Sequence, residues 1–512
     1  MTSQPPINDN RVLDTVILGA GFGGLCMGIR LRQSGVDDFV ILEKGDDIGG
    51  TWRDNTYPGC ACDVQSHMYS FSFEGKPDWT KRYAPWYEIY DYIQNTADRH
   101  GMRPFIRLNQ EVVSARYDDD TATWTIGTRD GKQWRCRHFV MAAGPLHVPS
   151  WPNIPGLDRF QGRMFHSARW EHDYDLRGKK VVSIGTGASA IQYVPQVAKE
   201  AQQLYVLQRT PAWLVPRDER QYSRLEKEAF RRFPLLRKLH RARLYWSNES
   251  RVWPIFQPRL ARALQQLAKL YIRWQVKDPE IARKLTPDYT MGCKRILISN
   301  DYYPTFNRDN VELVTEGIRE IREHSVVMND GREIEADCII VGTGFVVDPR
   351  KYLSQFELTG RNGQRLLDTW KDGAEAYLGI HVNGFPNMFQ LVGPNTGLGH
   401  NSILFMIECQ VNHILEARRL KRKRGADSIE VRPEAQAAFI RDVQQSLEGT
   451  VWTSGCQSWY QQEDGRNIAL WPYSTWKYWL RTRRVREADF RLEKAPATVD
   501  TEDAEALPAT GS

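Results

Sequence analysis

The sequence lacks any apolar run long enough to cross a bilayer. A membrane-spanning helix needs about 20 consecutive apolar residues, and no stretch of this 512-residue chain approaches that length. The first residues, MTSQPPINDNR, are polar and proline-rich, without the charged, apolar and cleavage regions of a secretory signal. We therefore expect a soluble cytoplasmic protein without a transmembrane segment.

The sequence also lacks the paired cysteines of zinc sites and redox centres. Its eight cysteines show no CxxC spacing; they are Cys26, Cys60, Cys62, Cys136, Cys293, Cys338, Cys409 and Cys456. Only one residue separates Cys60 from Cys62, which does not suit a redox pair. We expect reduced thiols throughout and no metal site.

A strong excess of positive charge is missing as well. Lys and Arg number 69 against 63 Asp and Glu, a net charge of +6, which is far from the composition of a nucleic-acid-binding protein. The small excess favours anionic ligands, and phosphate-bearing cofactors are sufficient to account for it. We expect no nucleic-acid partner.

What the sequence does contain, near its start, is a strand, a glycine turn, a helix and a second strand. The segment VILGAGFGGLCMGIRLRQSGVDDFVILEK carries the GxGxxG pattern as Gly19, Gly21 and Gly24. These glycines permit a tight turn, close approach of a pyrophosphate, and close packing of helix on strand. Glu43 ends the second strand, where a carboxylate binds ribose hydroxyls and repels a 2′-phosphate. The ligand of this domain is FAD or NAD.

The same pattern returns at GKKVVSIGTGASAIQYVPQVAKEAQQLYVLQR with a different ending. Its loop contains Gly185 and Gly187, followed by Ser189 and Ala190, so that alanine takes the third glycine position. Arg209 and Thr210 close the second strand. A guanidinium there binds a 2′-phosphate, which selects NADPH over NADH.

The two loops together predict a flavoprotein that NADPH reduces. Neither CxxC nor CxxxxC follows the first loop, which argues against a disulfide reductase, and molecular oxygen is the leading electron acceptor. We expect an α/β fold with two Rossmann-like dinucleotide-binding domains, for FAD and NADPH, and a helical insertion. The predicted divisions are a disordered N-terminus (1–10), the first part of the FAD domain (11–148), a linker (149–176), the first part of the NADPH domain (177–218), the insertion (219–290), the second part of the NADPH domain (291–345), the second part of the FAD domain (346–490) and a disordered tail (491–512).

The insertion is basic and contains aromatic residues, as in RLEKEAFRRFPLLRKLHRARLYW. We expect it to pack against the second nucleotide domain with a solvated outer face; peripheral contact with a membrane is the alternative.

The segment between the two loops carries a spaced pattern of its own, FQGRMFHSARW, with Phe160, Gly162, His166 and Trp170. It resembles the fingerprint of class B flavoprotein monooxygenases, and the final tryptophan resembles the Baeyer-Villiger branch. That pattern usually continues with Pro or Asp, whereas this chain has Glu171. Three further segments resemble the same family, and the similarity runs from about Asp14 to Tyr460: GGTWRDNTYPGCACD, the Lys294-Arg295 pair, and FPNMFQLVGPNTGLGHNS.

The resemblance implies a reaction. NADPH reduces FAD, O₂ forms a C4a-peroxyflavin, and one oxygen atom is inserted beside a ketone carbonyl to give an ester or lactone. The partners are then a small apolar ketone and O₂, for a monomer or weak homo-oligomer. Arg295 matches the catalytic arginine of the family by its place in the Lys294-Arg295 pair. The role suits arginine, because the chemistry needs a cation that does not lose its proton. Asp63 matches the carboxylate beside it.

The resemblance also implies cofactor contacts beyond the glycine loops. Those on the flavin side are Lys44, Gly50, Thr51, Trp52, Tyr57, Asp63 and Gly393. Those on the NADPH side are Ser189, Ala190, Gln192, Arg209, Thr210, Lys294 and Trp459.

The fingerprint residues Phe160, Gly162, His166 and Trp170 are assigned to coupling of the two domains. His166 has no partner histidine at ligand spacing, since His172 lies six residues on, and the reaction needs no metal. We expect it to hydrogen-bond backbone on both sides of the linker.

Two other functions stay open. A flavin-containing monooxygenase that makes N- or S-oxides shares most motifs, although its fingerprint usually ends in Tyr or Phe. A non-catalytic NADPH-binding sensor would use the same two folds. The substrate pocket is expected between the flavin domain, the insertion and the loop Thr396–Ser402.

Overall fold

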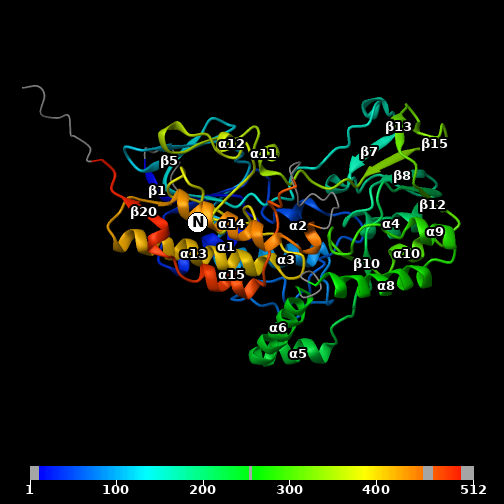
Figure 1. Ribbon diagram of the computed structural model, residues 1–512, viewed down its shortest axis with the longest axis horizontal. Coiled ribbons are helices and arrows are strands. Elements are labelled where there is room, and N and C mark those ends of the chain that lie inside the picture. The colour runs from blue at the N-terminus through cyan, green and yellow to red at the C-terminus, as the bar shows by residue number, and fades with distance from the viewer. Residues whose placement is uncertain (1–10, 253–256, 454–464, 497–512) are drawn as a thin grey trace, which may run out of the picture.

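The chain folds around two separate sheets, the first mixed and the second parallel. The computed structural model describes residues 11–252, 257–453 and 465–496. Figure 1 shows the first sheet and its helices on one side of the molecule and the second sheet on the other, with the connecting segments between them. This arrangement is the predicted α/β fold with two nucleotide-binding domains.

The first sheet is built from three distant parts of the chain. Strands β1, β2 and β3 are parallel, as are β6 with β18 and β4 with β17, whereas β4, β5 and β6 form an antiparallel meander. In sheet order the strands are β17 (Glu357–Thr359), β4 (Val112–Asp118), β5 (Thr123–Thr128), β6 (Gln133–Met141), β1 (Val12–Leu18), β2 (Phe39–Leu42) and β3 (Ile106–Arg107), with β18 (Met388–Gln390) beside β6. Strands β17 and β18 therefore return the chain to the sheet that begins with β1.

Helices cover the first sheet and fix its glycine loop. Helix α1 (Phe22–Gln33) follows β1 and packs against the long helix α13 (Ile403–Lys423), which packs in turn on α15 (Thr475–Thr482). The remaining elements of this half are α2 (Thr51–Asp54), α3 (Trp86–Arg99), α11 (Pro349–Tyr352), α12 (Leu366–Thr369), α14 (Pro433–Leu447), β19 (Ser428–Val431) and β20 (Phe490–Glu493).

The second sheet repeats the parallel arrangement on a smaller scale. Its strands in order are β12 (Val311–Val314), β9 (Gln203–Leu207), β8 (Lys180–Ile184), β16 (Cys338–Val341) and β7 (Arg163–His166). Helix α4 (Ala190–Glu200) follows β8, and a small antiparallel sheet precedes β16, formed by β13 (Ile318–Ile321), β14 (Ser325–Met328) and β15 (Glu333–Glu335). Because β7 pairs with β16, the fingerprint segment is the edge of this sheet.

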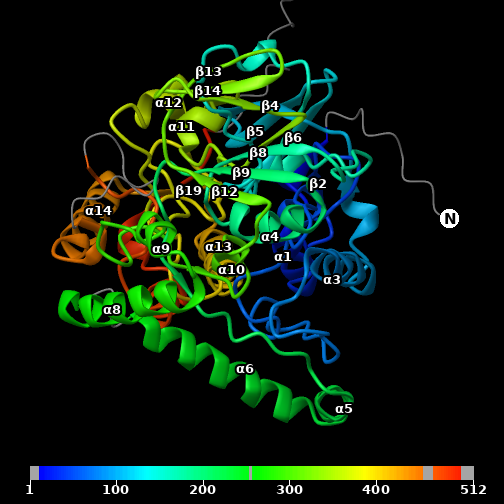
Figure 2. The ribbon, with the colours of Figure 1, turned by 90° about the vertical axis from the view of Figure 1, so that its right-hand side faces the viewer.

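Helices dominate the segment between β9 and β12. Ser223 begins the first of them with a capping box, in which its hydroxyl accepts from the Glu226 backbone and the Glu226 carboxylate accepts from the Ser223 backbone. The elements are β10 (Leu214–Val215), α5 (Arg224–Arg232), α6 (Pro234–Glu249), α8 (Pro258–Gln275), α9 (Pro279–Lys284), β11 (Leu297–Ile298) and α10 (Tyr302–Thr305). Figure 2 shows α5 and α6 projecting from the body of the molecule.

Two expectations from the sequence are wrong. The folded chain continues past residue 490, because β20 pairs antiparallel with β19, a contact that no local pattern signals. Cys293 is disulfide-bonded, so the chain does not contain reduced thiols throughout. Residues 1–10 and 497–512, expected to be disordered, lie outside the described ranges.

Candidate functional site

The first glycine loop can exist only with glycine at its outer positions. Gly19 has φ +97°, and a Cβ added at Gly24 would lie 1.8 Å from the Gly19 carbonyl oxygen. Gly21 is the N-cap of α1 and leaves that helix without a side-chain cap or an acidic residue in its first turn. The N-terminal amides of α1 are therefore available to an anion, which the helix dipole also favours.

Glu43 lies directly against this loop. Its buried carboxylate accepts hydrogen bonds from the Ala20 amide at 2.8 Å and the Gly45 amide at 2.9 Å. It also forms an ion pair with Arg53, whose Nη1 is 3.0 Å from Glu43 Oε1. Sequence reasoning missed Arg53, because nothing in the local pattern indicates that α2 folds back onto the end of β2.

The other flavin-side candidates differ in how closely they contact the first glycine loop and in how deeply they are buried. Gly50 faces Gly21 backbone to backbone, since a Cβ at Gly50 would lie 3.1 Å from the Gly21 Cα. Thr51 begins α2, and Trp52 is buried with its indole nitrogen donating to the Tyr69 hydroxyl at 3.1 Å. The Lys44 side chain is exposed.

Gly393 is brought to the same edge of the first sheet by β18. The strand pairs with β6, and the Leu391 amide then donates to the Met141 carbonyl. Leu391 also contacts helix α1, because a Cβ at Gly23 would lie 3.4 Å from its Cδ1. At Gly393 itself a Cβ would lie 2.4 Å from the Gly379 carbonyl oxygen, so that only glycine fits.

The second glycine loop is more open than the first. Gly185 has φ +113°, and a Cβ there would lie 2.4 Å from the Gly342 carbonyl oxygen. A Cβ at Gly187 would meet nothing within 4 Å. Ser189 precedes α4 without capping it through its side chain, and Ala190 begins the helix, whose first turn has no acidic residue. This helix end also presents amides to an anion.

Two cations converge beyond this loop. Burial and the nearby Arg209 guanidinium both lower the pKa of Lys294. Thr210 is fixed there too, because its carbonyl accepts from the Thr186 hydroxyl at 2.9 Å. Like charges held together favour an anionic ligand between them.

Asp63 and Arg295 form an ion pair that joins distant parts of the chain. Asp63 Oδ2 accepts from Arg295 Nε at 3.1 Å and from Nη2 at 2.5 Å. About a third of each side chain is exposed, 33% for Asp63 and 35% for Arg295. The pair therefore keeps a fixed guanidinium at a surface that a ligand can reach.

Gln192 connects the Asp63 loop to helix α4. Its Oε1 accepts from the Tyr57 hydroxyl at 3.0 Å and from the Ala61 amide at 3.3 Å. Its Nε2 donates to the Ala61 carbonyl at 3.0 Å. Gly59 permits the close approach, since a Cβ there would lie 2.5 Å from the Gln192 carbonyl oxygen. Tyr57 and Gln192 thus meet at the boundary between the two domains.

The fingerprint packs onto the second sheet and α4. A Cβ at Gly162 would lie 2.5 Å from the Phe160 ring and 2.6 Å from the Asp337 carbonyl oxygen. The Trp170 ring contacts Phe165 and the α4 residue Tyr193, with centroid distances of 5.0 and 5.5 Å.

His166 lies fully buried at the end of β7. Its Nδ1 accepts from the Ala168 amide at 3.1 Å, and burial lowers the pKa of the ring to about 4. The imidazole is therefore neutral near pH 7. The nearby Gly344 backbone, after β16, raises the pKa in opposition. Nε2 has no hydrogen-bond partner among the described residues, so the expected bonding to backbone on both sides of the linker is seen on one side only.

The residues after the fingerprint also have specific partners. Glu171 forms an ion pair with Arg163 on β7. His172 Nε2 is 2.8 Å from the Thr56 hydroxyl, which connects the linker to the loop that contains Tyr57. Sequence reasoning missed this contact, because His172 shows no motif of its own.

The loop Thr396–Ser402 meets the insertion through a buried acidic residue. Glu249 at the end of α6 accepts from Asn401 Nδ2 at 2.7 Å and from the Thr475 hydroxyl at 2.6 Å, and lies 3.3 Å from His400 Nε2. The three segments expected around a substrate are therefore in contact. Glu249 was not among the sequence candidates.

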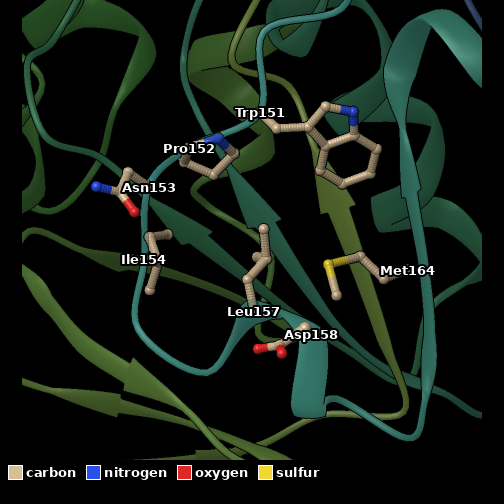
Figure 3. A pocket seen from close by; sticks show the side chains of 7 residues that line it. All are labelled: Trp151, Pro152, Asn153, Ile154, Leu157, Asp158 and Met164. Atoms are coloured by element: carbon tan, nitrogen blue, oxygen red, sulfur yellow. The ribbon is translucent and has the colours of Figure 1, made fainter.

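A pocket beside β7 lies apart from the candidate cofactor residues (Figure 3). Figure 3 shows its walls, which are Trp151, Pro152, Asn153, Ile154, Leu157, Asp158 and Met164. None of the candidate cofactor residues lines it, so the chemistry is not assigned to it. Trp459 lies outside the described residues, and within them no group of His, Cys, Asp and Glu is arranged to hold a metal.

Comparison with known proteins adds independent findings. Residues 16–234 match the family described as Pyridine nucleotide-disulphide oxidoreductase, although no redox CxxC follows the first loop. A protein of Pseudomonas aeruginosa named Baeyer-Villiger monooxygenase is 45% identical over 97% of this chain and 94% of its own length.

Solved structures with a similar fold include another monooxygenase. A steroid monooxygenase in its oxidized form bound to NADP shares 32% identity and a TM-score of 0.86, over 94% of this chain and 100% of that chain. The structure of OTEMO in complex with FAD and NADP shares 28% identity and a TM-score of 0.85, with the same coverage.

Proposed function

Because this chain belongs to the Baeyer-Villiger monooxygenase family, we propose that it inserts one oxygen atom from O₂ beside the carbonyl of an apolar ketone, giving an ester or lactone. It is an FAD-containing, NADPH-dependent monooxygenase. The site residues assigned below are part of the proposal.

One observation supports the proposal above the others. Two consecutive residues, Lys294 and Arg295, contact different domains: Lys294 lies near Arg209 of the second, and Arg295 binds Asp63 of the first. Lys294 would bind the 2′-phosphate end of NADPH, and Arg295, the next residue, would provide the cation at the reaction site. The two sites are therefore joined by one peptide bond. This connection is what a reaction that uses both nucleotides requires.

The residues around the first loop fit FAD. The amides of α1 receive the pyrophosphate at Gly21, and the absence of a Cβ at Gly50 leaves room for it. Glu43 lies where the ribose hydroxyls are bound, oriented by Arg53. Trp52, Tyr57, Gly393, Thr51 and Lys44 are assigned to the same cofactor.

FAD supplies the electron transfer and the activation of O₂. The protein must hold a cation beside the oxygen where negative charge develops, and Arg295 keeps its proton at any pH that the enzyme meets. Asp63 accepts two hydrogen bonds on one oxygen and so fixes the orientation of the guanidinium. The walls must also exclude water from the reacting atoms.

The residues around the second loop fit NADPH. Gly185, Gly187 and the α4 amides at Ser189 and Ala190 receive the pyrophosphate. Arg209, Thr210 and Lys294 bind the 2′-phosphate. Gln192 and the fingerprint residues Phe160, Gly162, His166 and Trp170 fix this domain against the first.

Removing the cation of Arg209 should reduce the preference for NADPH. A charge-assisted hydrogen bond contributes about 1.5–3 kcal/mol, so Arg209→Ala should raise the KM for NADPH roughly 10- to 100-fold. The KM for NADH should not change, because NADH has no 2′-phosphate. Steady-state oxidation of both nucleotides measures the two values.

A matched control is Arg177→Ala in the same domain, where the exposed guanidinium pairs with Asp175. It should leave both KM values unchanged. Equal increases of both KM values in Arg209→Ala would contradict a phosphate-binding role.

A bulky or long apolar ketone suits the proposed pocket, which the insertion, the flavin domain and the loop Thr396–Ser402 enclose. We also propose a cytoplasmic location. Its support is that free thiols outnumber the one described cysteine that is disulfide-bonded, Cys293. The free thiols are Cys26, Cys60, Cys62, Cys136, Cys338 and Cys409.

A substrate panel tests the function. Purified protein should be yellow and should convert ketones to esters or lactones with NADPH and O₂, as mass spectrometry would show. Sulfoxides from thioethers without any ester or lactone would establish the heteroatom-oxidising alternative instead. Protein that cannot take up FAD would favour the non-catalytic sensor.

A further inference from the structure

Helix α6 of the insertion has a second apolar face that nothing in the described residues covers. Leu235, Leu239, Ala242 and Trp246 follow the i, i+4, i+7, i+11 spacing of one helical stripe. The stripe is exposed, 69% at Leu235 and 60% at Trp246. The packed face lies opposite: Leu244 is buried there, and Asn248 exchanges two hydrogen bonds with Gln65. A helix packed on a globular body normally exposes its polar side.

Helix α8 also exposes an apolar stripe where a polar face would be normal. Ala261, Ala268 and Ile272 are buried and form its packed face. Leu260, Leu264, Leu267, Leu270 and Trp274 form a separate stripe that is exposed throughout, reaching 79% at Trp274. Figures 1 and 2 place α6 and α8 at the same margin of the molecule, outside both sheets. We call the six residues Leu235, Leu239, Trp246, Leu267, Leu270 and Trp274 the apolar margin.

The charge that α6 and α8 themselves expose has one sign. Helix α8 contains Arg259, Arg262, Lys269 and Arg273 and no acidic residue. The basic residues of α6 include Lys238 and Arg243, which are exposed on the two sides of its stripe, and its only acidic residue, Glu249, is buried. An apolar stripe with basic borders is typical of helices that lie in the interface of an anionic membrane.

A second copy of this chain is a poorer occupant. Pairing two such faces would bring like charges together in an isologous contact, which costs free energy. A bilayer with anionic headgroups offers opposite charge and an apolar layer at once. Interfacial binding needs no spanning helix, and none of the described helices is long and apolar enough to cross a membrane.

We propose that α6 and α8 bind the surface of an anionic phospholipid bilayer through the apolar margin. The leucine and tryptophan side chains enter the boundary between headgroups and acyl chains, and Lys238, Arg243 and the basic residues of α8 contact the phosphates. This attachment does not depend on the proposed reaction.

Vesicle sedimentation of the full-length holoenzyme tests the proposal. Wild-type protein should bind vesicles of phosphatidylcholine with about one third phosphatidylglycerol, and the binding should weaken in high salt. Leu239→Ser combined with Trp246→Ser should lower the partition coefficient at least about tenfold. Lys238→Glu combined with Arg243→Glu should remove the preference for phosphatidylglycerol over phosphatidylcholine alone.

The control is Tyr87→Ser on helix α3, an aromatic that is 54% exposed away from the apolar margin; it should bind as wild type. NADPH oxidation in each variant shows that the fold and the flavin are retained, which separates membrane binding from the proposed function. Absence of wild-type binding, or wild-type binding by the Leu239 and Trp246 double variant, overturns the proposal. So does light scattering that shows a wild-type dimer which the double variant dissociates, because a second copy then covers the face.

Discussion

Replacing Arg295 with alanine should lower ester or lactone formation by about 10²–10³-fold or more, the usual effect of removing one group that stabilises developing negative charge on oxygen. The expectation follows from the ion pair, which keeps a permanent cation in one orientation beside a surface that ligands reach. NADPH consumption should persist, because the 2′-phosphate is bound by Lys294 and Arg209. The measurement is product formed per NADPH consumed.

Three further variants sharpen this result. Arg295→Lys keeps the charge but not the two-point contact with Asp63, and should recover little product. Asp63→Ala should lower ester or lactone formation, because the Arg295 guanidinium loses its fixed orientation. The decrease should be smaller than in Arg295→Ala. Arg322→Ala removes an exposed arginine paired with Glu320 and Glu333, and should be silent. Ester formation by Arg295→Ala above about a tenth of the wild-type rate would contradict the catalytic assignment.

Gly24→Ala should give a protein almost without FAD. The added Cβ would lie 1.8 Å from the Gly19 carbonyl oxygen, a backbone atom that cannot move without opening the loop. Overpacking of this kind costs more than about 3 kcal/mol and displaces α1 from the amide positions that a phosphate needs. The flavin absorbance per protein measures the effect, and the melting temperature should fall with it.

The second domain offers the matched control. A Cβ at Gly187 meets nothing within 4 Å, so Gly187→Ala should keep full FAD content and the wild-type melting temperature. Its effect should be confined to a raised KM for NADPH, where the methyl group meets the pyrophosphate. Full flavin content in Gly24→Ala would refute the steric argument.

Local sequence patterns predicted the parts of the site that lie within one βαβ unit. The loop from Gly19 to Gly24 and the position of Glu43 follow from strand, turn and helix signals within about 30 residues. Glu43 does reach the loop, through the Ala20 amide. Its partner Arg53 was missed, because the return of α2 is a tertiary contact with no local signal.

Contacts between distant segments came from the resemblance or were not predicted. The pairing of Asp63 with Arg295 has no signature in either segment alone. The same is true of Thr56 with His172 and of Glu249 with Asn401, where each residue is an ordinary polar side chain until the fold brings it to its partner. Strand β20 was missed for this reason too, since an edge pairing depends on β19.

For the insertion, the helical repeat of apolar residues did not predict which face of each helix is buried. The helical spacing of leucines and alanines in α8 was visible in the sequence, and the insertion was expected to pack against the second nucleotide domain with a solvated outer face. The outer face of α8 instead exposes leucines and a tryptophan. Periodicity cannot say which of two apolar stripes is buried, because both have the same repeat. The structure buries the stripe with small residues, Ala261 and Ala268, which permit close approach, and exposes the one with leucines.

Gln192 is one physical connection between the two candidate nucleotide sites, because its side chain contacts Tyr57 and Ala61 from helix α4. Gln192 lies in the first turn of α4, and its amide holds Ala61, two residues before Asp63. A movement of α4 would therefore have to break these hydrogen bonds or carry the Asp63 loop with it. Linkage between two binding sites is reciprocal. If NADP⁺ binding shifts the Asp63 loop toward one position, a ligand that binds that position more tightly would in turn strengthen the binding of NADP⁺.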